Sequence, residues 1–174
     1  MRLLFIGDSL IEFYDWQRRF PGNEVFNYGI AGETVEGLYS RLQVVLNKIS
    51  SPDFVFIMTG INNVAMGDRS FIKTYGKIVA EIKAKSPSAK IFIHSLLPVL
   101  FPFITNDEIR EINIELRDMA ERENVSYFDI HPVFLDASGS PRASFLLDDG
   151  VHLSDEGYLA WSAEIEKQLL RLDA

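Results

Sequence analysis

The 174-residue sequence contains no cysteine and only three histidines. The absence of cysteine excludes a disulfide framework, a thiolate metal site and a cysteine nucleophile. Imidazole chemistry is therefore restricted to His94, His131 and His152. Any mechanism that needs a histidine base has to use one of these three.

Basic clusters and long apolar runs are also lacking. The chain has 17 Lys and Arg against 25 Asp and Glu, which gives a formal net charge of -8. Phosphate backbones are bound mainly by clustered Lys and Arg, so we expect no nucleic-acid partner. The first apolar run, Leu3 to Ile6, is too short for a signal peptide or a transmembrane segment. We therefore expect a soluble cytoplasmic protein.

The sequence does contain β-rich runs that alternate with segments of helical period. The β-rich runs cover residues 2–7, 24–28, 53–59, 90–96 and 125–130. Apolar residues recur with helical spacing over 35–49, 71–82, 105–120 and 154–172. This alternation predicts an α/β fold, a three-layer α/β/α sandwich of flavodoxin-like type with a five-stranded parallel sheet. The strand order 2-1-3-4-5 is expected from that fold class.

No repeat, low-complexity stretch or linker interrupts this pattern, so we expect one domain over residues 1–174. Thr105 and Glu108 have the spacing of a capping box and mark the start of the third helix. The segment 131–153 contains no convincing helix or strand. A connection of that length in a compact domain is usually functional or disordered.

Polar, glycine-bearing segments follow four of the predicted strands, at residues 7–9, 27–34, 60–63 and 148–152. Ligands of open parallel sheets bind beyond the carboxyl ends of the strands, so these segments would meet at one edge. Together they supply a hydroxyl, amide donors, a carboxylate and an imidazole. These are the parts that a Ser-His-Asp acyl-transfer site requires.

The candidate nucleophile also has an ordinary structural explanation. Ser9 follows a strand and could be a helix N-cap. Asp8 beside it resembles a base, but an aspartate is a weak base at neutral pH and is better suited to bracing the turn. Position alone leaves both interpretations of Ser9 open.

The three histidines differ in their surroundings. His94 lies inside an apolar run and is most simply a core residue, whereas His131 ends the fifth strand at the correct edge of the sheet. His152 has Asp149 three residues upstream. One short loop can thus supply the imidazole and the carboxylate that fixes its tautomer, which favours His152 as the base.

Two further residues are candidates for an oxyanion hole. Gly32 could simply relax the turn before a helix, and Asn62 could close an Asx turn. With the backbone N–H of Ser9, the Gly32 N–H and the Asn62 side-chain amide would give three donors to one oxyanion. Each such donor is typically worth about 10² to 10³ in rate.

These motifs resemble the four blocks of the SGNH, or GDSL-type, hydrolase family. In order, they are Gly7-Asp8-Ser9-Leu10, the Gly32 segment, Gly60-x-Asn62 and Asp149-x-x-His152. The resemblance extends from Phe5 to the last predicted helix. It implies Ser9 as nucleophile, His152 as base with Asp149 as its partner, and an oxyanion hole of Ser9, Gly32 and Asn62. It also implies that no metal or organic cofactor is required.

Two details are similar to one branch of this family. Asn63 stands where the third block commonly has Asp, and Trp16 and Phe20 follow the serine block. Both features resemble the branch that includes the catalytic subunits of intracellular platelet-activating factor acetylhydrolase. The resemblance implies a serine esterase or lipase that hydrolyses acyl or acetyl esters of a small-molecule, lipid or sugar alcohol.

The segment 96–104 is unusually apolar for a connection near such a site. It could line an acyl or alcohol pocket, or it could pack against the final helix or a partner subunit in a homodimer. The run Phe145–Leu147 has the same alternatives. We expect substrate contacts from Leu10, Asn63, Leu97, Val99 and Phe101.

Two other classes of function stay open. A metal-dependent phosphohydrolase could use Asp8, Asp148, Asp149 and His152 as ligands. A non-catalytic binding module could use the same flavodoxin-like fold. The sequence has no Gly-x-Ser-x-Gly motif and no Gly-rich phosphate loop after the first strand, which disfavours an α/β-hydrolase and a nucleotide-binding protein.

Overall fold

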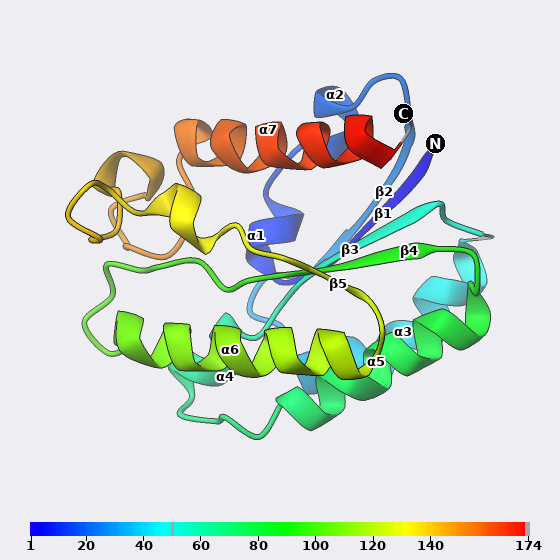
Figure 1. Cartoon of the computed structure of the whole chain (residues 1–174), viewed down its shortest axis with the longest axis horizontal. Coiled ribbons are helices and arrows are strands. Elements are labelled where there is room, and N and C mark those ends of the chain that lie inside the picture. The colour runs from blue at the N-terminus through cyan, green and yellow to red at the C-terminus, as the bar shows by residue number, and fades with distance from the viewer. Residues whose placement is uncertain (50, 173–174) are drawn as a thin grey trace.

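Five parallel strands form the central layer of the protein, shown in Figure 1 as a computed structural model. The structure describes residues 1–49 and 51–172; residue 50 and residues 173–174 of the expected 1–174 domain lie outside the described residues. The strands are β1 (Arg2–Gly7), β2 (Glu24–Gly29), β3 (Phe54–Met58), β4 (Lys90–His94) and β5 (Ser126–Phe128). They are arranged in the order β2-β1-β3-β4-β5, and each neighbouring pair is parallel. The predicted strand order is confirmed.

Helices cover both faces of this sheet. On one face lie α3 (Val35–Lys48), α4 (Ile61–Ala65), α5 (Ile72–Lys85) and α6 (Asn106–Arg122) (Figure 1). On the other face lie α1 (Ser9–Glu12), α2 (Trp16–Arg19) and α7 (Asp155–Leu172). Successive strand residues point to opposite faces, so Leu4 and Ile6 pack toward the first group and Leu3 and Phe5 toward the second. The predicted α/β/α sandwich is confirmed.

Aromatic side chains dominate the layer between the sheet and α7. The Phe5 and Trp16 rings stack with their centroids 4.3 Å apart, and Trp16 Nε1 donates to the carbonyl oxygen of Ile11 at 2.8 Å. Trp161 of α7 is fully buried in the same cluster. Because full burial of a side chain such as Phe contributes roughly 1.5–3 kcal/mol, this packing holds α2 and α7 against the sheet, with α1 bonded to Trp16.

Three strands are shorter than predicted, and the first of them, β3, covers Phe54–Met58 rather than residues 53–59. β4 ends at His94 rather than at residue 96, because the N–H and carbonyl of Leu96 bond to the Asn113 side chain at 2.7 and 2.9 Å. β5 ends at Phe128 rather than at residue 130. The N–H of Ile130 donates to Ser95 Oγ at 3.0 Å. The backbone after β5 is thus also bonded to a side chain and not to a neighbouring strand.

Several short elements were absent from the sequence-based prediction. Helices α1, α2 and α4 have only four or five residues each, too few to show a helical period. The segment 131–153, expected to be irregular, contains two short 3-10 helices, η1 (His131–Phe134) and η2 (Ala143–Phe145). It runs at the same end of the sheet as the segment 96–104 (Figure 1).

The carboxyl ends of three strands are level at one edge of the sheet. Gly7 of β1 pairs in register with Gly29 of β2 and with Met58 of β3. The segments that follow these strands therefore leave the sheet side by side, as the sequence predicts. Within the described ranges, no helix is long and apolar enough to cross a membrane.

Candidate active site

Ser9 begins α1, directly after the tight connection from β1. A Cβ atom added at Gly7 would lie 1.8 Å from the backbone oxygen of Met58, so only glycine fits where β1 ends. Asp8 is the N-cap of α1, and its Oδ1 accepts the N–H of Leu10 at 3.1 Å. Ser9 is the first residue of α1, so Asp8 and not Ser9 occupies the N-cap position. The bracing role expected of Asp8 is confirmed, and the N-cap interpretation of Ser9 is wrong.

The turn before α7 brings an imidazole and a carboxylate to Ser9. Asp149 Oδ1 accepts the N–H groups of Val151 and His152, both at 2.9 Å, which closes the turn. Asp149 Oδ2 lies 2.6 Å from His152 Nδ1, and His152 Nε2 lies 3.0 Å from Ser9 Oγ. With the proton on Nδ1, Nε2 has a lone pair for the serine hydroxyl. The arrangement is that of a nucleophile, a base and an orienting carboxylate.

The two carboxylates at the site differ in electrostatic environment. Burial alone would raise the pKa of Asp149, but hydrogen bonds from Val151 and His152 outweigh it and hold this pKa below its ordinary value. Asp8 is completely buried, and burial raises its pKa to about 7. Asp149 is therefore the ionised partner of the imidazole at neutral pH, while Asp8 readily holds a proton.

Potential oxyanion donors come from the segments after β1, β2 and β3. Gly32 has a φ of 74°, a left-handed conformation that favours glycine. Within the part of the chain that the structure describes, the N–H groups of Ser9 and Gly32 donate to no acceptor. Asn62 Nδ2 donates to the carbonyl oxygen of Glu33 at 3.0 Å, which uses one of its two hydrogens. Each of the three sequence-predicted donors thus retains at least one hydrogen for a ligand.

The other two histidines are engaged in packing. His94 is 1% exposed, and its Nδ1 accepts the indole N–H of Trp161 at 2.9 Å. Burial lowers the pKa of His94 to about 3, so it stays neutral. His131 Nδ1 lies 2.9 Å from the carbonyl oxygen of Leu96, a contact that anchors the segment after β4. Neither ring contacts Ser9, which leaves His152 as the imidazole at the site.

A small cleft opens directly onto the serine. This nucleophile cleft has a volume of about 240 Å³. Its lining comprises Ser9, Ile61, Asn62, Ala65, Phe101, Ile104, Asp149, Val151 and His152. The segment 96–104 thus contributes two apolar side chains to the cleft, Phe101 and Ile104. Its other members divide between the core and the surface: Leu96, Leu97 and Val99 are buried, and Phe103 is 81% exposed.

Four of the five expected substrate contacts require correction. Leu10, Leu97 and Val99 are each 3% exposed and pack in the two hydrophobic cores. Asn63 is 2% exposed, with its Oδ1 accepting the N–H of Val35 and its Nδ2 donating to acidic side chains. The three apolar side chains therefore serve core packing, and the Asn63 amide holds neighbouring backbone and side-chain groups in place. Only Phe101 of the five lines the nucleophile cleft.

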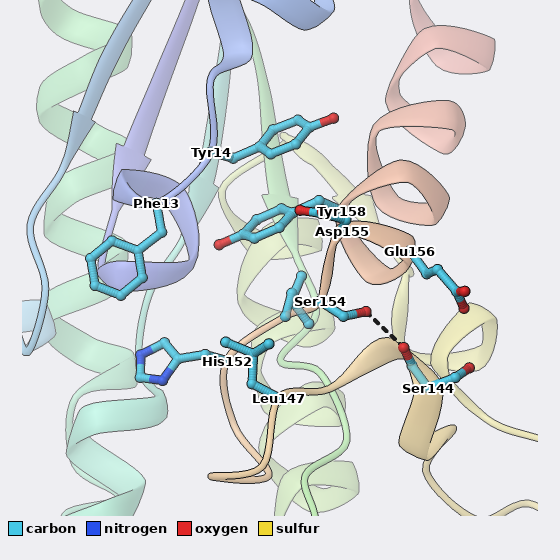
Figure 2. Close-up of a pocket in the computed structure, with 10 residues that line it drawn as sticks. Phe13, Tyr14, Ser144, Leu147, His152, Ser154, Asp155, Glu156 and Tyr158 are labelled. Carbon is cyan, nitrogen blue, oxygen red and sulfur yellow. Dashed lines mark hydrogen bonds between the residues drawn. The ribbon is translucent and has the colours of Figure 1, made fainter.

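A second, larger cleft lies on the other side of His152. This aromatic cleft has a volume of about 560 Å³. Its lining comprises Phe13, Tyr14, Ser144, Leu147, His152, Leu153, Ser154, Asp155, Glu156 and Tyr158. Figure 2 shows the Phe13 ring beside the His152 imidazole at one end and Glu156 at the other. The Phe13 and His152 centroids are 5.4 Å apart, and Tyr14 stacks on Tyr158 at 4.5 Å. Among the described residues, His152 alone lines both clefts.

The acidic residues of the site do not form a metal-ligand cluster. Asp8 is completely buried and caps α1, and Asp149 Oδ2 contacts His152 Nδ1. In the described ranges, no three His, Cys, Asp or Glu side chains are arranged so that they could hold a metal ion. The phosphohydrolase hypothesis built on Asp8, Asp148, Asp149 and His152 therefore has no geometric support.

Sequence reasoning missed the residues that hold the Gly32 segment. Arg41 of α3 forms an ion pair with Glu33, and Glu12 Oε2 accepts the N–H of Ala31 at 2.5 Å. The Arg41–Glu33 and Glu12–Ala31 contacts each join a helix to the loop after β2. The distance in sequence between the two partners matches neither neighbouring positions on a helix nor paired positions in a hairpin. No local sequence signal could have identified them.

The chain is similar to known proteins over most of its length. Residues 5–160 match the family model described as "GDSL-like Lipase/Acylhydrolase family". Platelet-activating factor acetylhydrolase IB subunit alpha1 of Homo sapiens is 26% identical over 98% of this chain and 76% of its own length.

Solved structures share the fold. A Streptococcus pneumonia protein, provisionally described as a platelet activating factor, has a TM-score of 0.88 at 24% identity, covering 96% of this chain and 83% of its own. An acetylxylan esterase from Geobacillus stearothermophilus has a TM-score of 0.78 at 22% identity, covering 95% and 92%. At these identities, the two likenesses show a common fold.

Proposed function

Since the chain belongs to the GDSL-like lipase/acylhydrolase family and is a carboxylic ester hydrolase, we propose that it acts through an acyl-enzyme on Ser9. His152 is the general base and acid, and Asp149 holds its ring. The N–H groups of Ser9 and Gly32, with the Asn62 amide, stabilise the oxyanion. The observation that carries this proposal is the continuous contact from Asp149 through His152 to Ser9, at 2.6 and 3.0 Å.

Two half-reactions follow from these roles. His152 Nε2 removes the hydroxyl proton as Ser9 Oγ attacks the ester carbonyl, and the three donors bind the oxyanion. The tetrahedral intermediate collapses, the bond to the alcohol breaks, and His152 protonates the departing oxygen. Water, deprotonated by the same imidazole, then attacks the acyl-serine and releases the acid. Ionised Asp149 stabilises the imidazolium in both steps.

Replacing the nucleophile tests this proposal. Ser9→Ala should lower kcat for nitrophenyl acetate by about 10⁴-fold or more, because it removes the hydroxyl that His152 Nε2 contacts. Ser138→Ala is a matched control, since Ser138 is exposed and bonds only within its own loop. Folding of both variants is checked by circular dichroism. A Ser9→Ala protein with wild-type turnover would overturn the assignment.

The two clefts support a division of the substrate between them. The oxyanion donor Asn62 lines the nucleophile cleft, so the acyl chain extends there, against Phe101 and Ile104. The alcohol is protonated by His152 and leaves toward the aromatic cleft, which His152 also lines. Volumes of about 240 and 560 Å³ favour a short acyl group on a larger alcohol. The names acetylhydrolase and acetylxylan esterase among the relatives agree with a short acyl group.

A chain-length series tests this division. The wild type should prefer nitrophenyl acetate to the hexanoate. Phe101→Ala should improve kcat/KM for the hexanoate by about tenfold relative to acetate, the gain expected when about two further CH₂ groups are buried at about 0.8 kcal/mol each. Phe13→Ala is the matched control on the other side of His152. It should leave the acyl-length preference unchanged and alter discrimination among acetate esters of different alcohols. An unchanged series in Phe101→Ala would contradict the assignment of the nucleophile cleft.

A further inference from the structure

We infer that Arg41 and Glu33 form a positioning pair that fixes two of the oxyanion donors, Gly32 and Asn62, and keeps the donor region electrically neutral. Neither residue contacts the reacting atoms. The inference rests on the proposed function, because it concerns the donors that the acyl-enzyme mechanism uses.

The Arg41–Glu33 ion pair is bidentate and largely shielded from water. Arg41 Nε lies 2.6 Å from Glu33 Oε1, and Arg41 Nη2 lies 2.6 Å from Glu33 Oε2. Only 18% of the Arg41 side chain and 9% of the Glu33 side chain are exposed. Arg41 Nη2 also donates to the carbonyl oxygen of Tyr28 at 2.8 Å. Parallel bonds of this kind fix orientation as well as distance, so α3 holds the segment after β2 in one position.

Glu33 connects the two donors. It directly follows Gly32, so the placement of Glu33 sets the peptide that ends the Gly32 turn, and its carbonyl oxygen accepts Asn62 Nδ2 at 3.0 Å. On the other side of Gly32, the Ala31 N–H is held by Glu12 at 2.5 Å. The free N–H of Gly32 therefore lies between two anchored residues. A shift of Glu33 would move the Gly32 and Asn62 donors together.

The ion pair also controls charge beside the nucleophile. The negative charge of the Glu33 carboxylate is felt next to Ser9, because it helps to raise the pKa of the buried Asp8. Without Arg41, an almost buried and unpaired carboxylate would repel the oxyanion that forms on the substrate. Removing both charges avoids that repulsion and leaves only the loss of anchoring. The double variant should therefore be more active than the arginine variant alone.

Steady-state kinetics of four variants with nitrophenyl acetate test the inference: Arg41→Met, Arg41→Lys, Glu33→Gln and the double variant Glu33→Gln/Arg41→Met. Arg41→Met should lower kcat about 10²-fold, the size of one lost oxyanion donor, with KM within about threefold. The inhibition constant of an alkyl boronic acid, which forms a tetrahedral anion on serine, should rise in parallel. Arg41→Lys keeps the positive charge without the bidentate geometry, so its kcat should lie between those of Arg41→Met and the wild type. The double variant should be about tenfold faster than Arg41→Met.

Arg19 provides a matched control, because it forms the same kind of contacts away from the site. Its guanidinium bonds to both oxygens of Glu166, at 2.7 and 3.3 Å, and to Ser162 Oγ at 2.9 Å. Arg19→Met should lower the unfolding midpoint and leave kcat unchanged. Where Arg41→Met fails to fold, Arg41→Lys and Glu33→Gln decide the matter.

The outcomes separate this inference from the proposed function. If Ser9→Ala is inactive while Arg41→Met, or the two milder variants in its place, keep kcat within twofold of the wild type, the positioning role is wrong and the nucleophile assignment stands. If Ser9→Ala is active, the proposed function fails first. A double variant no faster than Arg41→Met would overturn the role in charge compensation.

Discussion

The two sides of Ser9 are built in different ways. On one side, His152 and Asp149 belong to a single turn, and the carboxylate both closes that turn and holds the ring. On the other side, Gly32 and Asn62 come from separate segments that are joined through Glu33. The proposed proton-transfer side is thus local in sequence, whereas the proposed donor side depends on contacts between a loop and the three helices α1, α3 and α4. The difference indicates that the donor side is the one distant substitutions can disturb.

The largest effect is expected on the proton-transfer side. Asp149→Asn can present an NH₂ group to His152 Nδ1, which places the ring proton on Nε2 and removes the lone pair that faces Ser9. We expect kcat to fall by about 10³ to 10⁴. Asp148→Asn is the matched control: this neighbouring carboxylate is exposed and should not affect kcat. Equal losses in the two variants would argue for a diffuse acidic site and against an orienting carboxylate.

A smaller loss is expected on the donor side. Asn62→Ala removes one of three donors, so kcat for nitrophenyl acetate should fall about 10²- to 10³-fold with little change in KM. Asn62→Asp keeps the shape but places a carboxylate near the oxyanion, and it should be at least as slow. A kcat of Asn62→Ala within threefold of the wild type would remove Asn62 from the oxyanion hole.

The smallest effect is expected for the buried Asp8, which acts on the stability of the folded protein. Burial raises the pKa of Asp8 from 3.8 to about 7 in the folded protein. Between these values the folded state keeps a proton that the unfolded chain has released. The contribution to stability is therefore complete below about pH 4 and is lost as the pH rises through about 7.

Asp8→Asn removes this titration. The unfolding free energy of the wild type minus that of Asp8→Asn should decrease by about 1 kcal/mol for each pH unit between pH 5 and 7. Urea denaturation of both proteins at three pH values measures this slope. A difference that does not vary with pH would show that Asp8 is ionised throughout.

The sequence was sufficient for the layers of the fold and for the turn that holds Asp149 and His152, because both depend on short-range patterns. Alternating strand and helix periods predicted the layers, and the three-residue spacing of Asp149 and His152 predicted one turn with both groups. The ends of β4 and β5 could not be predicted, because Asn113 and Ser95 capture backbone groups from distant parts of the chain.

The residues that surround the site could not be predicted from the sequence for the same reason. Leu97 and Val99 are as apolar as Phe101, and only the path of the chain after β4 decides which of them reaches the cleft. The Glu33–Arg41 pair depends on how α3 packs against the loop after β2. These features are set by tertiary packing, which periodicity and motif spacing do not encode.

Covalent labelling tests the central claim most directly. The folded wild type is treated with a fluorophosphonate, digested and examined by mass spectrometry. We predict a single adduct on the peptide that contains Ser9, loss of esterase activity in proportion to labelling, and no adduct in Ser9→Ala. An adduct on a different residue, or an active protein that stays unlabelled, would contradict an acyl-enzyme on Ser9.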